Sequence, residues 1–92
     1  MLDYSKLPER LQGGAQRYIE NGIIPGDFLT AVIQNNLKET IGRADDDMIK
    51  VLREIVTWFY WEAPAGCWGS VKHMNEWIQK HDTEYRLRTE KI

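Results

Sequence analysis

The sequence predicts an all-α protein, a small single domain built as a bundle of about four helices. Apolar residues recur at intervals of three and four over most of the chain, which is the period of a helix that buries one face. Residues that favour helix ends separate these stretches. At 92 residues, 42% of them hydrophobic, the chain has room for one packed core and not for two.

The first predicted helix begins at Pro8, which suits a first turn, and stops before Gly22, which suits a helix end. Its apolar positions share one face: Leu11, Ala15, Tyr18 and Ile19. Gly13 and Gly14 lie inside this helix, where each costs roughly 1 kcal/mol relative to alanine. We interpret the stretch as a marginal helix held by tertiary contacts. The alternative is close approach of another backbone or of a ligand.

A Pro-Gly turn leads to a second predicted helical stripe over residues 28–33, with Asp27 as its N-cap. Asn35 and Asn36 follow, and we expect a kink there because asparagine side chains hydrogen-bond locally and compete with the helix. The stripe resumes over residues 37–41, as a second short helix or as a continuation of the first.

The central predicted helix starts at Asp45 and ends before Pro64. Three successive aspartates open it; they complement the positive end of the helix dipole, and Asp45 caps free N–H groups. A cation site is the alternative, but the ligand spacing of a calcium loop is missing. Apolar residues cover most of the girth of this helix, so we expect it to lie centrally or to face a partner on its second side.

A loop over residues 65–69 follows, and Ser70 caps the last predicted helix. The inner face of that helix carries Val71, Met74, Trp77 and Ile78. The helical periodicity fails after His81. We therefore assign residues 1–81 to the helical domain and residues 82–92 to a charged tail that is exposed or frays.

The composition argues against several classes of protein. Twelve basic and 14 acidic residues give a net charge of −2, so nucleic-acid binding is disfavoured for lack of a basic excess. A single cysteine cannot form an internal disulfide, which fits a reducing cytoplasm. The N-terminus lacks the pattern of a signal peptide, and no apolar run reaches the length of a membrane span. We expect an intracellular protein without membrane contact.

The sequence offers no catalytic constellation. Cys67 would need a base and an orienting group to act as a nucleophile, and His73 is six residues away with no third group apparent. We interpret Cys67 as a packing residue beside Trp68. One cysteine and two histidines at these spacings do not match a zinc site, and no glycine-rich phosphate loop is present. We therefore expect no enzymatic activity, no metal and no cofactor.

Aromatic residues crowd the end of the central helix and the loop that follows it. Trp58, Tyr60, Trp61 and Trp68 cannot all be buried in one small core, so we expect part of this set to be exposed. Such a surface would bind a partner protein or a flat ligand such as a nucleobase. Ser70, at the start of the next helix, is a candidate for holding an anion near free backbone N–H groups.

Two further sets of residues are candidates for binding. Arg43 and Asp45 lie at the opposite end of the predicted central helix, so a homo-oligomer would be needed to bring them to the aromatic end. The amides of Gln34, Asn35 and Asn36 have the donors and acceptors that read adenine edges. They keep a small DNA-binding regulator of the helix-turn-helix type open as an alternative.

A combined pattern runs through residues 17–22 (RYIENG), 25–32 (PGDFLTAV), 35–39 (NNLKE), 43–45 (RAD) and 64–70 (PAGCWGS), with Trp77 following. Together these segments, over roughly residues 7–80, resemble a group of short proteins encoded by bacteriophages and prophages. The resemblance implies a phage accessory protein in the host cytoplasm and transfers no catalytic residue. We expect a non-enzymatic binding protein that inhibits a host defence system by occluding a host protein or by sequestering a nucleotide-like ligand. A self-associating structural or assembly protein is the remaining alternative.

Overall fold

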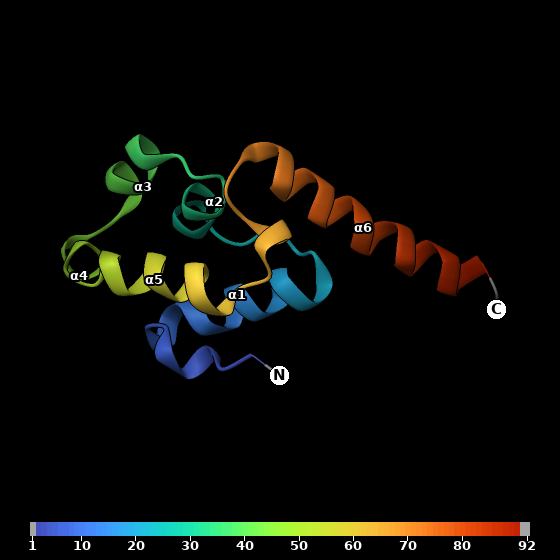
Figure 1. Ribbon diagram of the computed structural model, residues 1–92, viewed down its shortest axis with the longest axis horizontal. Coiled ribbons are helices and arrows are strands. Elements are labelled where there is room, and N and C mark those ends of the chain that lie inside the picture. The colour runs from blue at the N-terminus through green and yellow to red at the C-terminus, as the bar shows by residue number, and fades with distance from the viewer. Residues whose placement is uncertain (1, 91–92) are drawn as a thin grey trace.

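The computed structural model describes residues 2–90, with side chains described for residues 2–85, and all regular structure in this range is helical (Figure 1). The elements in order are η1 (Tyr4–Lys6), α1 (Glu9–Asn21), α2 (Asp27–Ile33), α3 (Leu37–Arg43), α4 (Asp46–Lys50), α5 (Leu52–Glu62), η2 (Ala65–Cys67) and α6 (Val71–Glu90). The predicted all-α class is confirmed. The predicted number of about four helices is wrong, because residues 28–41 and the central helix each form two helices.

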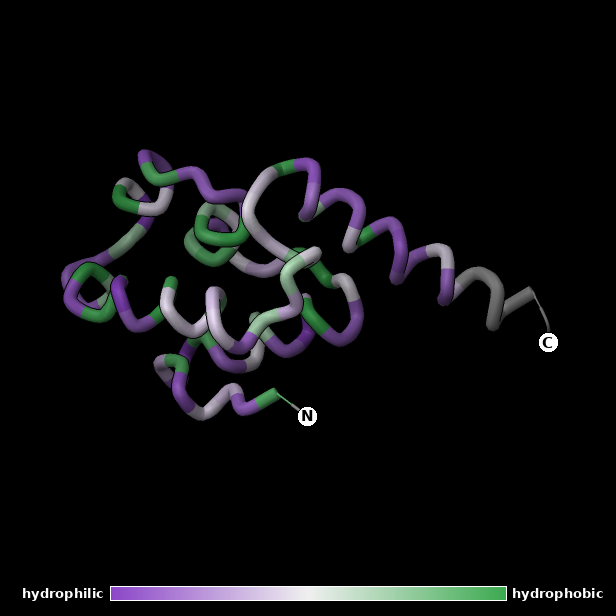
Figure 2. The backbone as a smooth tube through the Cα atoms, viewed as in Figure 1, coloured by the Kyte–Doolittle hydropathy of each residue, from purple (hydrophilic) through white to green (hydrophobic). Residues whose placement is uncertain are grey.

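Helices α1, α2 and α5 supply most of the core. The largest fully buried side chains are Tyr18, Phe59, Ile33, Ile55 and Cys67. In Figure 2 hydrophobic residues dominate α2, whereas hydrophilic residues dominate α6 where it leaves the body of the protein. Burial of apolar surface is the main favourable term in folding, so these central side chains hold the short helices together.

Buried polar groups join segments that are far apart in the sequence. The Tyr18 hydroxyl donates to the Cys67 carbonyl at 2.6 Å, and the Trp77 Nε1–H lies 3.2 Å from the carbonyls of both Tyr18 and Ile19. The Gly69 N–H donates to the Ile33 carbonyl at 2.8 Å. These bonds fix the loop at η2 and the start of α6 against α1 and α2, because leaving such groups buried without partners would be costly.

The kink expected at the paired asparagines is a complete helix end. Asn35 adopts a left-handed conformation with φ 57°, and the N–H groups of Asn35 and Asn36 donate to the carbonyls of Val32 and Ala31. This is the Schellman pattern of helix ends, in which asparagine often replaces glycine. The Asn36 side chain then caps α3 by accepting from the Glu39 N–H at 3.1 Å.

The predicted central helix is broken at Val51, which has φ −113° and ψ 14°. The Val51 N–H donates to the Met48 carbonyl at 3.2 Å and so closes α4, and the Val51 carbonyl accepts from Ile55 as α5 begins. A β-branched residue loses side-chain freedom inside a helix, which lowers the cost of a break at this position. The predicted central helix is therefore two helices, α4 and α5, and not one continuous helix.

Most predicted helix ends are confirmed. Asp45 caps α4 by accepting from the Met48 N–H at 2.9 Å, and the Ser70 hydroxyl caps α6 by accepting from the His73 N–H at 3.0 Å. Asp27 was expected to be an N-cap, and this is wrong: Gly26 holds the cap position and Asp27 is the first helical residue. Its carboxylate is left to interact with other side chains.

Helix α6 packs on the body through its first half and then projects away from it (Figure 1). Met74 is buried, Trp77 and Ile78 are half-buried, and residues 82–85 are exposed. The helix is continuous across residue 82, where we placed the start of a charged tail, and it continues to Glu90. This projection lengthens the molecule to 47 Å against 25 and 20 Å in the other directions.

Gly22 lies where the end of α1 meets α6, and we expect its replacement by alanine to destabilise the fold. Its φ of 68° is left-handed, and an added Cβ would lie 2.7 Å from the His81 Cβ. We expect Gly22→Ala to lower the free energy of unfolding by roughly 1–3 kcal/mol, measured by urea denaturation.

Gly42 provides the matched control for this measurement. It lies inside α3 with open space around its Cα, so Gly42→Ala is expected to raise the free energy of unfolding by roughly 0.5–1 kcal/mol. Equal effects at Gly22 and Gly42 would contradict the assigned contact between Gly22 and α6.

Candidate functional site

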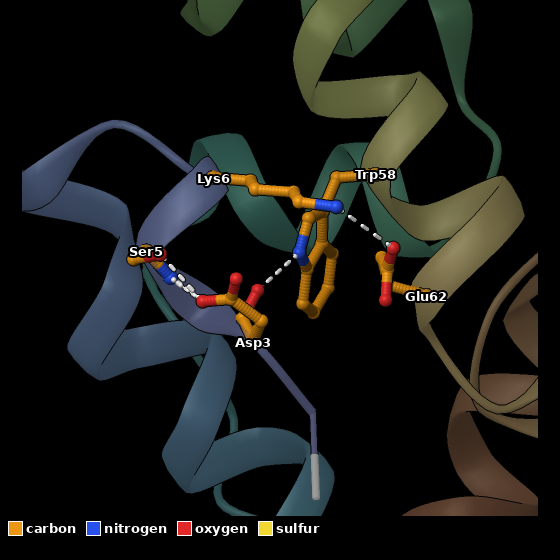
Figure 3. A network of polar contacts seen from close by, with 5 residues as sticks. All are labelled: Asp3, Ser5, Lys6, Trp58 and Glu62. Carbon is orange, nitrogen blue, oxygen red and sulfur yellow. Dashed lines mark hydrogen bonds and ion pairs between the residues drawn. The ribbon is translucent and has the colours of Figure 1, made fainter.

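The structure separates the aromatic residues that we expected to form one surface. Trp58 was predicted to bind a ligand or partner, but only 3% of it is exposed, and this prediction is corrected. The N-terminal segment covers it, and the Trp58 Nε1–H donates to the Asp3 carbonyl at 2.9 Å (Figure 3). The Tyr4 ring lies 5.4 Å from the Trp58 ring. Lys6 reaches past the indole to pair with Glu62 at 3.4 Å. Trp58 is therefore a core residue.

Trp61 and Tyr60 are the exposed members of the set. They are 74% and 67% exposed, and their rings meet edge to face at 4.9 Å. Trp61 borders a hollow of about 580 Å³ whose lining also includes the edge of the buried Trp58 and the side chains of Lys6, Arg53, Thr57 and Glu62. Large exposed aromatic rings beside arginine are typical of protein-binding surfaces.

Trp68 and Ser70 lie in the loop that precedes α6. Trp68 is half-buried, with its ring 5.6 Å from that of Phe59. The Ser70 hydroxyl is occupied by its cap and by a 2.7 Å contact with Nδ1 of His73. Neither residue borders the hollow beside Trp61. The structure therefore does not bring Trp68 and Ser70 into one site with Trp61.

Cys67 is buried in the core, as its interpretation as a packing residue requires. Burial raises the pKa of its thiol to about 12 from an ordinary value of 9.0. The nearest histidine in sequence, His73, contacts Ser70. A nucleophilic cysteine needs a lowered pKa and an accessible thiolate, so this thiol is unsuited to catalysis.

The amides that might read DNA bases have local roles instead. Asn35 ends α2, the Asn36 side chain caps α3, and the Gln34 amide lies 3.4 Å from the Met74 sulfur. Most of α2 is buried, which is unlike a recognition helix that presents a face to the major groove.

Arg43 lines a different hollow, and Asp45 lies beside it through its ion pair with Arg10. The hollow has a volume of about 350 Å³ and lies among α1, α2, α3 and α4. We call it the arginine groove; its lining includes Arg10, Gly14, Arg17, Asp27, Phe28 and Arg43. Its lining comes from three segments of the combined sequence pattern, those at residues 17–22, 25–32 and 43–45.

Ion pairs hold two of the three arginines at the groove. Arg10 pairs with the Asp45 carboxylate, and Arg43 lies 3.5 Å from Asp27 and 3.3 Å from Glu39. All five side chains are more than half exposed. The Arg10 guanidinium and the Met48 N–H both hold the pKa of Asp45 below its ordinary value of 3.8. The pair of Arg10 with Asp45 therefore persists at neutral pH. Each of these ion pairs contributes little to stability because water surrounds it.

The paired glycines of α1 have different neighbours. An added Cβ at Gly14 would make ordinary contacts, 3.4 Å from Leu29 and 3.8 Å from Pro25, and Gly14 forms part of the groove wall. At Gly13 the nearest atoms belong to the Arg17 guanidinium, at 3.0 Å. The Arg17 guanidinium thus lies over α1, in the space that a side chain at position 13 would occupy.

A signal for this groove was present in the sequence. Residues 10, 14 and 17 are spaced by four and three, which places two arginines and a glycine on one face of α1. We overlooked this stripe because the apolar face of the same helix is stronger. The approach of Arg43 depends on tertiary structure and could not be read from spacing.

The two neighbouring tryptophans of α5 offer a direct test of these assignments. We expect Trp58→Ala to lower the free energy of unfolding by about 3–5 kcal/mol, since it removes a buried ring and leaves the Asp3 carbonyl unpaired. Trp61→Ala should change it by no more than about 0.5 kcal/mol. Chemical denaturation followed by far-UV circular dichroism measures both, and similar losses in the two variants would contradict the placement.

Alkylation tests the state of Cys67. Because burial raises the pKa of the thiol, we expect iodoacetamide at pH 8 to modify it roughly a hundredfold or more slowly in the folded protein than in urea. Mass spectrometry of timed samples measures both rates. Equal rates in the two states would show an accessible thiolate.

Among the described residues, no helix is both long and apolar enough to cross a membrane, and no three histidine, cysteine, aspartate or glutamate side chains are grouped to hold a metal ion. Comparison with protein-family models, with curated proteins and with solved structures found no match to this chain.

Proposed function

We propose that this protein is a non-enzymatic binding protein that sequesters a small, phosphate-bearing, nucleotide-like ligand in the arginine groove. The observation that carries this proposal is the meeting of Arg10, Arg17 and Arg43 at one hollow, in a chain whose net charge is −2. Three guanidinium groups thus meet at one hollow of an acidic protein. Carboxylates pair with two of them, and the third, Arg17, is left to attract an anion.

Guanidinium groups suit phosphate because they donate two parallel hydrogen bonds in a fixed plane. Arg17 has no ion-pair partner among the described side chains, so it is available to a ligand. Arg10 and Arg43 are held by exposed carboxylates, and pairs of that kind are worth about 0–1 kcal/mol. A dianionic phosphate can displace such partners at small cost.

The remaining lining suits the rest of a nucleotide. The half-buried Phe28 ring offers a surface on which a base can stack. Gly14 and Gly26 place no side chain in the groove. The volume of about 350 Å³ lies near the lower end of the roughly 300–1,000 Å³ typical of small-molecule sites, which favours a ligand of about one nucleotide.

The resemblance to phage and prophage proteins supplies a setting for this activity. A protein that withholds a nucleotide from host machinery needs no catalytic group, only affinity and sufficient copies. Inhibition of a host defence system in the bacterial cytoplasm is consistent with such sequestration. The resemblance supports this part of the proposal, and the arginine groove supports the choice of ligand.

Occlusion of a host protein is the second candidate function. Trp61 and Tyr60 carry it, because a 74% exposed tryptophan beside Arg53 has the composition of an interface hot spot. The two candidates use different surfaces, since the hollow beside Trp61 and the arginine groove share no lining residue. Substitutions at Trp61 and at Arg17 therefore tell them apart.

Calorimetric titration with mononucleotides, dinucleotides and inorganic phosphate tests the first candidate. We expect one nucleotide class to bind, and Arg17→Ala and Arg43→Ala each to weaken it by roughly 10- to 100-fold, as loss of a charged hydrogen bond does. Arg53→Ala, on α5 and away from the groove, is the matched control and should leave affinity unchanged.

Two results would contradict this function. One is the absence of binding by every nucleotide tested, together with no extra mass on the protein in native mass spectrometry. The other is a loss of affinity in Arg53→Ala as large as that in Arg17→Ala, which would move the site to α5.

A further inference from the structure

The outer side of α5 stays uncovered in the fold. We expected the central helix to lie centrally or to face a partner on its second side, and α5 buries only one of its sides. The other side carries Val56, Tyr60 and Trp61, which are 39%, 67% and 74% exposed. Single exposed apolar side chains are ordinary, but three on one side of one helix mark a surface that another molecule covers.

A free cation and the exposed rings lie at opposite ends of this side of α5. Arg53 is exposed in the first turn, whereas Tyr60 and Trp61 lie in the last. Among the described side chains, no ion pair engages Arg53. A guanidinium group binds the negative face of an aromatic ring, and tryptophan is the best such ring. Within one copy Arg53 and Trp61 lie about 12 Å apart along the helix, which separates the two partners of that contact.

A second copy of the chain brings these two partners together. When two α5 helices pack face to face in opposite directions about a two-fold axis, Thr57, in the middle of each helix, faces Thr57 of the other copy. Trp61 of each copy then reaches Arg53 of the other. The two Arg53 side chains stand about 12 Å apart along the helices, whereas parallel packing would set these like charges side by side.

The hollow beside Trp61 fits this arrangement. Its volume is about 580 Å³, and its lining includes Arg53, Glu54 and Thr57, the residues that antiparallel packing brings to the Trp61 ring of the second copy. The exposed parts of Tyr60 and Trp61 from both copies provide on the order of 600 Å², about half of the roughly 1,200 Å² at which specific interfaces begin. Flanking side chains supply the rest, so the association is weak.

We propose that two copies of the chain associate through antiparallel α5 helices, with the Trp61 ring of each copy in the hollow of the other and stacked on Arg53. This association goes beyond the proposed nucleotide binding and leaves the arginine groove open, because the hollow and the groove share no lining residue. A host protein that used the same surface would have to displace the second copy. With a dissociation constant above roughly 10 μM, the chain is monomeric in the dilute samples used for denaturation.

Sedimentation equilibrium of the full chain from roughly 10 μM to 1 mM tests the proposal. We expect the average mass to rise from 10.8 kDa toward twice that value. Trp61→Arg sets two arginines against each other at both contacts and should weaken association roughly tenfold or more. Adding Arg53→Trp to it exchanges the two partners and should restore the association to within about threefold of the wild type. The control is Leu37→Arg, which changes a 72% exposed apolar residue of α3 and should leave association unchanged.

A cysteine at position 57 tests the direction of packing. Antiparallel helices bring residue 57 opposite itself, so Thr57→Cys is expected to form a disulfide-linked dimer on mild oxidation, seen by non-reducing gel electrophoresis. Glu54→Cys is the matched control, because residue 54 of the two copies stands about 9 Å apart along the helices, beyond the roughly 4–7 Å between Cα atoms that a disulfide spans. Cys67 is buried and is present equally in both variants.

Several results would overturn the proposal. One is a chain that stays monomeric at every concentration, which leaves the outer side of α5 to a different protein. Another is an association that Trp61→Arg does not weaken, or that the double exchange does not restore. A third is equal cross-linking at positions 54 and 57. Circular dichroism of each variant confirms that the fold is kept, and nucleotide binding is measured separately, so failure here leaves that proposal standing.

Discussion

Tyr18 is the residue through which the separate parts of this fold are joined. Its hydroxyl donates to the carbonyl of Cys67, and its own carbonyl accepts from the Trp77 indole and from the N–H of Gly22. One buried side chain and its peptide thus fix the loop before α6, the start of α6 and the left-handed end of α1. Burial also raises the pKa of the Tyr18 phenol, so the group stays a neutral donor at physiological pH. The arginine groove borders this junction, since Arg17, which lines the groove, directly precedes Tyr18 on α1.

The parts of the fold that could be predicted are those set by contacts between residues a few positions apart in the sequence. Gly22, Asp45 and Ser70 end or begin helices through contacts with residues only a few positions away, so their roles follow from sequence. Asn35 and Asn36 likewise end and begin helices through local contacts. The break at Val51 does not, because no proline or glycine marks it and a helical pattern runs straight through it. The covering of Trp58 by Asp3 and Tyr4 joins residues more than 50 positions apart, and periodicity within one helix carries no information about such a contact.

This difference explains why the sequence could not say how the candidate site residues lie relative to one another. Exposed aromatic surface was inferred from the number of rings in a small protein, and the number alone could not say that Trp58 faces inward while Trp61 faces outward. For the charged residues, the sequence pointed to candidate residues but not to their partners. Arg43 and Asp45 were recognised but assigned to the end of one long helix, whereas Asp45 pairs with Arg10 of α1 and Arg43 pairs with Asp27 of α2. A mixed and nearly balanced charge along the sequence concealed a local concentration of guanidinium groups that exists only after α1, α2 and α3 have packed.

Asp45 divides its two oxygens between two tasks. Oδ1 accepts the Met48 N–H and so caps α4, a helix of only five residues, while Oδ2 receives the Arg10 guanidinium. Helix order in α4 and the position of Arg10 are therefore thermodynamically linked through one carboxylate. Under the proposed function, a ligand that draws Arg10 away would act on the same carboxylate that caps α4. Because the pKa of Asp45 is already lowered, this link is present at neutral pH and is lost only in acid, as the pH falls through the lowered value.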